Sequence, residues 1–434
     1  MLETLIWATA AVCAAMVFYA WRRYRDVFHP LVLTAPMLAF MYVLMPLMLL
    51  KDGALYAYVS RAQAEFAQTL FLAGVGAFGL GCAVGGAARL RPSWSAAFVD
   101  YDRRMIRQGG YILGALGLAA WTYTVINAGG FLSVFSRPKG FGWSEWGAIR
   151  EAAYLMIAGL LLLLSPEGFD PKSGRWRLAV TAFSIPYLIQ GLLGAQRGPT
   201  FLIIGTLGLS WYMARGRRPP LAVVLGGGTA LVLLLLFLVL NRGEIYLGSD
   251  FEVKTDVSEF FEPSEANEYI FGVGCVTAAR QNGEYYWGKR YLAQVLVRPI
   301  PRQIWPTKYH DFGIPEIEQN AGVAGAGLLP VMGWSEIPGA AAGMVADVWV
   351  EFSWLSLPFL FLAGWTLGYA WRRAVHQSGP WTSLFMIGIL LSVYFVSQSG
   401  EAVIFRLLIL STATLWAWRR ARRQIQAVAL APAA

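Results

Sequence analysis

Apolar residues occur along this chain in long runs that short polar segments interrupt. Most runs are long enough to cross about 30 Å of hydrocarbon, and the fifth, sixth and seventh are shorter; we predict a membrane helix for each. The predicted helices cover residues 4–21, 31–50, 67–88, 109–128, 152–165, 178–195, 199–214, 221–240, 354–371, 380–397 and 402–418. The expected fold is therefore an all-α polytopic membrane protein with about eleven transmembrane helices.

One long polar segment, residues 241–353, separates the eighth predicted helix from the ninth. Within it, the pattern predicts a helix over Val276–Leu296 and another over Gly339–Phe352, lying at the membrane interface. Asn241–Glu268 is rich in acidic and aromatic residues without a clear period, which indicates a solvated arm. The expected organisation is transmembrane helices in 1–240, the loop with its interfacial helices in 241–353, transmembrane helices in 354–418 and a basic tail in 419–434.

The composition agrees with a membrane protein. The chain is 57% hydrophobic and 14% charged, whereas soluble domains carry about a quarter charged residues. The net charge of +9 does not indicate a nucleic-acid partner, because the positive residues lie in short loops between apolar runs. Cys13 and Cys82 lie inside apolar runs and Cys275 stands alone in the loop, so neither a metal site nor a disulfide framework is expected.

Basic residues predict the orientation of the helices. They gather in alternate loops, which all fall on one side of an eleven-helix protein: Arg22, Arg23, Arg25, Arg89, Arg91, Arg103, Arg104, Arg107, Lys172, Arg175, Arg177, Arg215, Arg217, Arg218, Arg372, Arg373, Arg419, Arg420, Arg422 and Arg423. Lysine and arginine are enriched in cytoplasmic loops. We therefore expect the N-terminus outside, the C-terminus inside and the large loop on the extracytoplasmic face.

Several arginines on the outer side are candidates for binding an anion. Arg197 lies in a hairpin so short that its guanidinium must sit at the outer lipid–water boundary, where it either binds lipid headgroups or holds phosphate oxygens. The loop adds further candidates for a diphosphate clamp, each of which has surface pairing with a loop carboxylate as its alternative: Arg280, Arg290, Arg298 and Arg302. Arg406, inside the last predicted helix, needs Glu401 or a substrate phosphate as its partner.

Candidates for acid–base chemistry are few. Asp347 and Glu351 are four residues apart and therefore share a helix face, where they act as a base or simply keep that face wet. Glu336 and His310 are the other candidate bases near the outer membrane level. The candidate catalytic residues are thus Asp347, Glu336 and His310.

The order of these features resembles the Wzy-type polymerases of O-antigen and exopolysaccharide repeat units. The resemblance rests on the hairpin Gln196–Pro199 (QRGP), on YYWGKRYL followed by PIPRQIWPTK, and on GAAAGMVADVWVEFSWLSLP. It extends over about Gly194 to Leu357, with Asp347 at the family's acidic position. Ser353 and Ser356 stand where the family usually has glycines.

The resemblance implies a fold similar to integral membrane glycosyltransferases of the GT-C type. It implies that the chain joins oligosaccharide units carried on undecaprenyl diphosphate at the outer face of a bacterial inner membrane, without metal or cofactor. Arginines would stabilise the departing diphosphate, and a carboxylate or histidine would activate the acceptor. The expected partners are the lipid-linked oligosaccharide and the lipid bilayer, with a chain-length regulator and a flippase as further candidates.

Two alternatives share part of this pattern. An O-antigen ligase uses the same donor and architecture, and His310 would fit its loop base. A transporter or flippase of lipid-linked sugars belongs to another class. Its helices would carry polar residues at mid-bilayer, whereas Arg406 is the main exception in the apolar runs here.

Overall fold

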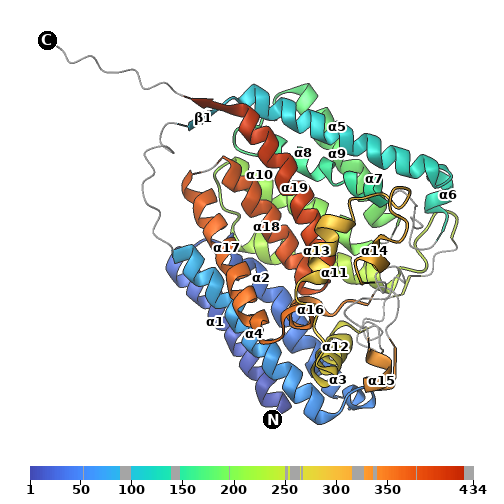
Figure 1. The fold of residues 1–434 in the computed structure, drawn as a ribbon. Helices are drawn as coiled ribbons and strands as arrows, with labels where there is room; N and C mark the ends of the chain where they lie inside the picture. The colour runs from blue at the N-terminus through green and yellow to red at the C-terminus, as the bar shows by residue number, and fades with distance from the viewer. Residues whose placement is uncertain are drawn as a thin grey trace.

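The computed structural model describes most of the chain, and its main elements are helices (Figure 1). The described residues are 1–51, 53–87, 99–137, 147–194, 196–249, 253–254, 264, 267–314, 327–335, 340–377 and 379–424. Among these residues the only strands are β1 (Val99–Tyr101) and β2 (Arg422–Gln424), which form one short antiparallel pair.

Each of the eleven predicted apolar segments is helical. These segments form α1 (Leu2–Tyr24), α2 (Pro30–Ala39) with a π-helical turn and α3 (Met45–Lys51), α4 (Arg61–Ala87), α5 (Arg103–Asn127), α8 (Leu155–Leu163), α9 (Gly174–Leu192), α10 (Arg197–Ala214), α11 (Leu221–Leu240), α17 (Ser356–Gln377), α18 (Pro380–Val396) and α19 (Gly400–Ala421). By length and apolar composition, six helices among the described residues can cross a membrane: Leu2–Tyr24, Pro30–Lys51, Arg61–Ala87, Arg103–Asn127, Ala222–Leu240 and Gly343–Gln377. The protein is therefore an all-α protein with several candidate membrane spans.

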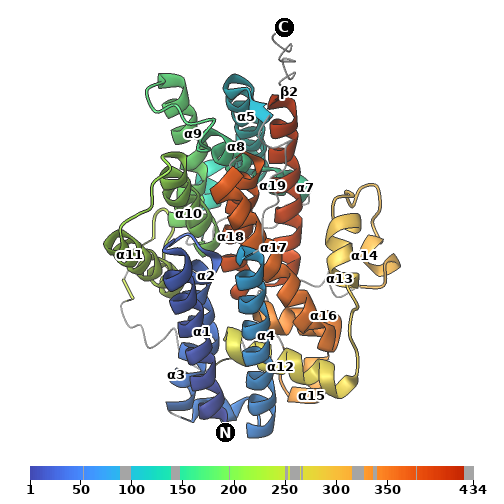
Figure 2. The ribbon, with the colours of Figure 1, turned by 90° about the vertical axis from the view of Figure 1, so that its left-hand side faces the viewer.

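Shorter helices lie in the connections between these segments. They are α6 (Gly130–Phe135), α7 (Gly147–Ala152), α12 (Glu268–Asn282), α13 (Lys289–Leu292) with a π-helical turn at Ala293–Val297, α14 (Lys308–Asp311), α15 (Leu328–Met332) and α16 (Gly343–Phe352). Figure 2 shows α12, α15 and α16 in the half of the molecule that holds the N-terminus. We call this half the loop end, and the half that carries β1 and β2 the tail end.

Contacts at the tail end join segments that were predicted to share the cytoplasmic side. The two strands bring the connection after α4 against the residues that follow α19. Asp26, after α1, accepts from Arg218 Nε at 2.6 Å, and Arg107 pairs with Asp170 beyond α8. At the loop end, the indole N–H of Trp334 donates to the carbonyl of Tyr58 at 3.0 Å. The basic loops thus meet at one end of the bundle, away from α12–α16.

Glycines allow α4 and α17 to pack backbone to backbone. A Cβ atom at Gly81 would lie 2.1 Å from the carbonyl oxygen of Phe361, and one at Gly85 would lie 2.1 Å from that of Trp365. Gly364 and Gly368 on α17 are equally close to the backbone of α4. Because each pair is four residues apart, the glycines form matching small-residue stripes of the kind that bring membrane helices together.

A buried glutamine anchors the loop end to the bundle. Gln68 of α4 donates to Thr9 Oγ1 and to the carbonyl of Tyr42, each at 3.0 Å, and accepts from the hydroxyl of Tyr269 on α12 at 3.0 Å. The Tyr42 hydroxyl in turn accepts from the backbone N–H of Val345 on α16 at 3.1 Å. Every polar atom of the Gln68 amide group is therefore used, which removes the cost of burying it.

Two predicted elements of the loop are wrong in detail. The predicted helix Val276–Leu296 is broken, because Gly283 ends α12 in a left-handed conformation with φ 67° and a new helix begins at Lys289. The predicted helix Gly339–Phe352 is α16, but residues 343–351 are all buried instead of presenting a wet face. α16 packs against α12, α4 and α17, so its carboxylates lie in the protein interior.

Candidate functional site

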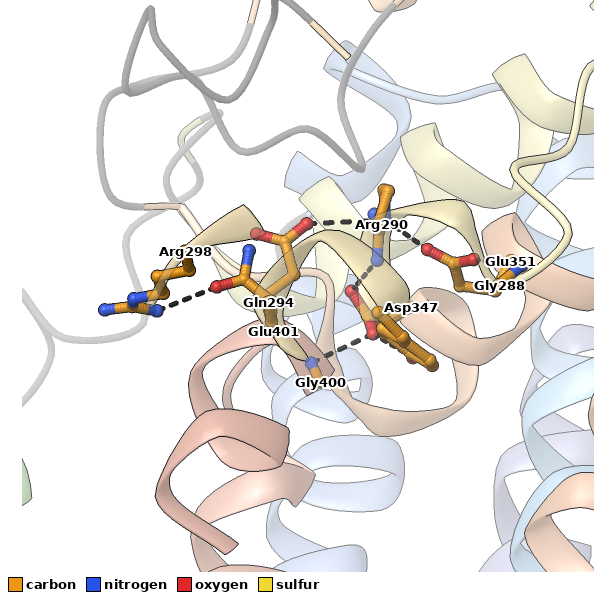
Figure 3. Close-up of polar contacts among 9 residues, drawn as sticks. Gly288, Arg290, Gln294, Arg298, Asp347, Glu351, Gly400 and Glu401 are labelled. Carbon is orange, nitrogen blue, oxygen red and sulfur yellow. Dashed lines mark hydrogen bonds and ion pairs between the residues drawn. The ribbon is translucent and has the colours of Figure 1, made fainter. Parts of the chain in front are cut away.

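Arg290 lies at the centre of a buried group of carboxylates at the loop end (Figure 3). Its side chain is fully buried, although it comes from the short helix α13. Its Nη2 is 2.6 Å from Asp347 Oδ1, its Nε is 2.6 Å from Glu351 Oε1, and the same Nε is 3.4 Å from Glu401 Oε1. We call these four residues the carboxylate clamp, because they tie the loop to α16 and to the first turn of α19.

Further donors complete the hydrogen bonding of two of the carboxylates. Asp347 Oδ2 accepts from the Tyr291 hydroxyl at 2.5 Å and from the backbone N–H of Gly400 at 2.9 Å. Glu351 Oε2 accepts from the backbone N–H of Gly288 at 2.7 Å. A Cβ atom at Gly400 would lie 2.7 Å from Asp347 Oδ2, so only glycine fits at that position.

Burial and nearby charges determine the protonation of Arg290 in the clamp and of Tyr291 beside it. Burial opposes the charge of Arg290, but Asp347, Glu401 and Glu351 together raise the pKa of Arg290 well above its usual value. Burial, reinforced by Asp347, raises the pKa of Tyr291 well above its usual value. Arg290 is therefore a permanent cation, and Tyr291 is a neutral phenol that donates to Asp347.

A second group of arginines lies around Tyr394 near the start of α19. We call it the arginine cluster, and its members are Arg197, Arg242, Arg298 and Arg406. The guanidinium of Arg406 is 4.9 Å from the ring centroid of Tyr154 and 4.8 Å from that of Tyr394. Its Nε and Nη1 are buried and have no hydrogen-bond partner among the described residues. Arg406 therefore does not pair with Glu401, the protein partner that the sequence suggested, because Glu401 faces Arg290 instead.

Arg197 and Arg242 belong to the same cluster. Arg197 begins α10, and its Nη2 is 2.8 Å from Glu268 Oε1. Arg242, just after α11, is close enough to Arg197 and Tyr394 for both to act on it electrostatically. A Cβ atom at Gly198 would lie 3.2 Å from the Tyr394 ring, which shows how closely the hairpin packs there. The two like charges repel each other, and a bound anion would relieve that repulsion.

Arg298 connects the cluster with the clamp. Its Nη2 is 2.7 Å from Glu151 Oε1, its Nη1 donates to Gln294 Oε1 at 2.9 Å, and its guanidinium lies 4.7 Å from the Phe405 ring centroid. Glu151 Oε2 is buried without a hydrogen-bond partner among the described residues. Arg197, Arg242, Arg298 and Arg406 thus form the arginine cluster, and they come from α10, the end of α11, the loop and α19.

The structure places the other predicted site residues elsewhere. Arg280 is exposed and lies over the ring of Phe66, with 3.8 Å between guanidinium carbon and ring centroid. Arg302 is exposed, and the His310 side chain is 77% exposed beside Asp311. Glu336 lies outside the residues that the structure describes. Arg290, Arg298 and Arg302 do not form one clamp: Arg290 is buried among carboxylates, Arg298 binds Glu151 and Arg302 is exposed.

Asp347, a candidate base from the sequence, lies in the protein interior. It is fully buried and accepts three hydrogen bonds, so most of its roughly four acceptor sites are already used. Sequence reasoning missed Arg242 and Glu151 as members of the site. Arg242 had a usable signal, because it directly follows an apolar run in the same way that Arg197 directly precedes one.

The arginine cluster therefore provides several cations that could bind an anionic group, and the carboxylate clamp lies next to it. Comparison with models of protein families, with characterised proteins and with solved structures finds no match for this chain.

Proposed function

We propose that this protein is an integral membrane glycosyltransferase that polymerises oligosaccharide units carried on undecaprenyl diphosphate. Transfer takes place at the outer face of a bacterial inner membrane and builds O-antigen, capsule or exopolysaccharide. The observation that carries the proposal is Arg406, whose Nε and Nη1 are buried without a hydrogen-bond partner among the described residues. Three further arginines of the cluster lie around the same end of α19.

A buried guanidinium needs an anion to offset its loss of hydration. Arg406 has a side-chain hydrogen bond with Tyr394 and is attracted by Glu151, but its Nε and Nη1 still lack a partner among the described residues. Each buried donor left unsatisfied costs about 1–3 kcal/mol, and more in a charged group. A diphosphate is a suitable partner, because its oxygens accept paired hydrogen bonds from guanidinium groups.

The proposed orientation follows from the two ends of the bundle. The basic segments meet at the tail end, around Asp26–Arg218 and the β1–β2 pair, which suits the cytoplasmic side in an eleven-helix arrangement. The arginine cluster lies at the loop end and would then face outward. Because nucleotide donors are absent there, the bond to the prenyl diphosphate has to supply the free energy for transfer.

The cluster has a direct role in such a reaction. When the bond between the anomeric carbon and the phosphate oxygen breaks, negative charge grows on the diphosphate. Fixed cations stabilise that charge without reorganisation, and removal of one such group lowers kcat by about 10²–10³-fold. Leu407 and Leu408 are 39% and 40% exposed beside Arg406, so α19 offers an apolar surface next to the cations for the prenyl chain.

The test is elongation by purified protein in lipid nanodiscs supplied with a lipid-linked oligosaccharide, with products separated by size. Arg406→Gln should remove the product ladder, and Arg406→Lys should restore it only in part because lysine lacks the paired donors. Arg302→Gln is the matched control, because Arg302 is exposed in the loop. A normal ladder from both Arg406→Gln and Arg197→Gln would overturn the proposal.

Products also separate the proposal from its alternatives. A ladder of increasing length is expected from a polymerase. A single transfer to a lipid A core, without elongation, would identify a ligase. Movement of the lipid-linked sugar across the membrane without any new glycosidic bond would identify a flippase.

A further inference from the structure

Glu401 differs from every other carboxylate of the clamp in its hydrogen bonding. Asp347 and Glu351 accept from backbone N–H groups, from Arg290 and, for Asp347, from a tyrosine hydroxyl. Glu401 Oε1 is buried and has no hydrogen-bond partner among the described residues, and its ion pair with Arg290 is 3.4 Å long. Glu401 Oε1 is therefore held less closely by Arg290 than the facing oxygens of Asp347 and Glu351 are, and Figure 3 shows Glu401 on the opposite side of Arg290 from Glu351.

The charges around Arg290 favour a proton on this carboxylate. Three carboxylates converge on one guanidinium, so the clamp carries an excess of negative charge. When several carboxylates share a buried site, their mutual repulsion makes at least one of them bind a proton more readily. Asp347 accepts from three donors and Glu351 from two, whereas Glu401 Oε1 accepts from none among the described residues, so Glu401 has the most capacity left to take up a proton.

Glu401 is also the member that a substrate can reach. Its side chain is 17% exposed, whereas those of Asp347 and Glu351 are fully buried. Glu151, the nearest alternative, is 6% exposed and is held by Arg298 at 2.7 Å. A proton acceptor must lie within hydrogen-bonding reach of the group that it deprotonates, and Glu401 meets this requirement best.

The place of Glu401 in the fold connects it with the arginine cluster. It lies in the first turn of α19, and Arg298 acts on it electrostatically. Arg406 follows five residues later, which corresponds to about 7.5 Å along the helix axis. The two residues are about 140° apart around the helix axis, and Arg298, whose guanidinium lies 4.7 Å from the Phe405 ring centroid and which acts on Glu401, lies between them.

We propose that Glu401 is the catalytic base that accepts the proton of the acceptor sugar, an inference that rests on the glycosyl transfer proposed above. The acceptor oxygen forms a bond to the anomeric carbon of the donor while its proton moves to the Glu401 carboxylate. The bond from that carbon to the phosphate oxygen breaks, and its electron pair stays on the prenyl diphosphate, which Arg406 and its neighbours hold. The proton then leaves Glu401 to solvent.

Arg290 and Asp347 are positioning residues in this scheme. Arg290 fixes one oxygen of Glu401, and Asp347 holds the backbone of the adjacent Gly400. The clamp thereby holds the first turn of α19, and with it Glu401, against α13 and α16. Neither Arg290 nor Asp347 needs to touch the substrate.

The experiment compares Glu401→Gln and Glu401→Ala with the wild-type protein in the elongation assay, at saturating donor. Loss of a general base lowers kcat by about 10²–10⁴-fold, and both variants should still bind undecaprenyl diphosphate with wild-type affinity. Glu284→Gln is the matched control, because Glu284 is exposed in the turn after α12. Elongation by Glu401→Gln at more than a tenth of the wild-type rate would overturn the inference.

Azide provides a second measurement, because this anion attacks carbon without losing a proton. In Glu401→Ala it should restore cleavage of the donor and give a glycosyl azide with release of the prenyl diphosphate. In Arg406→Gln it should not, because the leaving group lacks its cation. Absence of rescue in Glu401→Ala, with normal binding of undecaprenyl diphosphate, would count against Glu401 as the base.

The wild-type pH profile keeps the inference testable even if the variants fold poorly. The kcat should fall at low pH as the base becomes protonated, and Glu401→Asp should keep this fall at a lower rate. A kcat that is flat down to pH 4 would reject Glu401. No elongation by the wild-type protein at any pH would instead reject the proposed function itself.

Discussion

Arg290 and Asp347 form an ion pair of 2.6 Å in which both side chains are fully buried, although 57 residues separate them in the chain. The pair joins α13 to α16 and, through the Gly400 N–H, to α19. It holds the loop that follows α13, which carries Arg298 of the arginine cluster to Glu151. The primary role of the pair is therefore to hold the loop against the helices.

Breaking this pair should destabilise the protein strongly. Arg290→Met leaves buried carboxylates without their cation, and removing one partner of a buried pair costs about 3–5 kcal/mol. We expect a clear drop in the melting temperature of the purified protein in detergent, followed by tryptophan fluorescence. Arg302→Met is the control, because that arginine is exposed. Equal melting temperatures for the two variants would contradict the assigned role.

The contact between α4 and α17 should not tolerate even one added methyl group. A Cβ atom at Gly364 would lie 2.1 Å from the carbonyl oxygen of Phe78, so Gly364→Ala must push the helices apart. Overpacking of this kind costs about 1–3 kcal/mol. Gly76→Ala, on α4, meets nothing within 4 Å and should be neutral or slightly stabilising. Thermal unfolding in detergent measures both, and equal stability of the two variants would disprove the close contact.

Labelling of single cysteines tests the proposed orientation. Cys13, Cys82 and Cys275 are all buried, so they give a low background. A membrane-impermeant maleimide should label Arg302→Cys at the loop end in intact spheroplasts. It should reach Lys172→Cys, after α8, only when the membrane has been opened. The reverse pattern would place the arginine cluster on the cytoplasmic side.

Arg242 should contribute to binding of the donor. If it contacts the diphosphate together with Arg197, loss of one charge-assisted hydrogen bond costs about 1.5–3 kcal/mol, which corresponds to roughly 10–100-fold in affinity. Arg242→Gln should weaken binding of undecaprenyl diphosphate by that factor in a filter-binding assay. Arg280→Gln should not, because that guanidinium lies over Phe66. Unchanged affinity in Arg242→Gln would remove Arg242 from the site.

Patterns that depend on neighbouring residues were read correctly from the sequence. Each apolar run is a helix, because hydrophobicity and length are local properties of a segment. The sequence placed Arg197 just before the seventh predicted helix, whereas α10 begins at Arg197 itself and includes Gly198 and Pro199. The spacing of Asp347 and Glu351 predicted one shared face, and both carboxylates do bind Arg290.

The contact between the matching glycines of α4 and α17 was not predicted from the sequence. Gly81 and Gly85 are four residues apart, as are Gly364 and Gly368, so each stripe is visible in the sequence. Their pairing was not predicted, because a stripe does not say which partner covers it. That choice depends on how the remaining helices fill the bundle.

By itself, the sequence determined the helical segments, the alternation of basic loops and the presence of arginines at helix ends. Only the tertiary structure decided that Asp347 forms an ion pair with Arg290 and that His310 is exposed. It also decided that Arg406 contacts aromatic rings, while Glu401 pairs with Arg290. Helix formation and loop charge depend on residues close in the chain. The burial and pairing of a charge depend on groups that folding brings together from distant segments, and no local pattern specifies those groups.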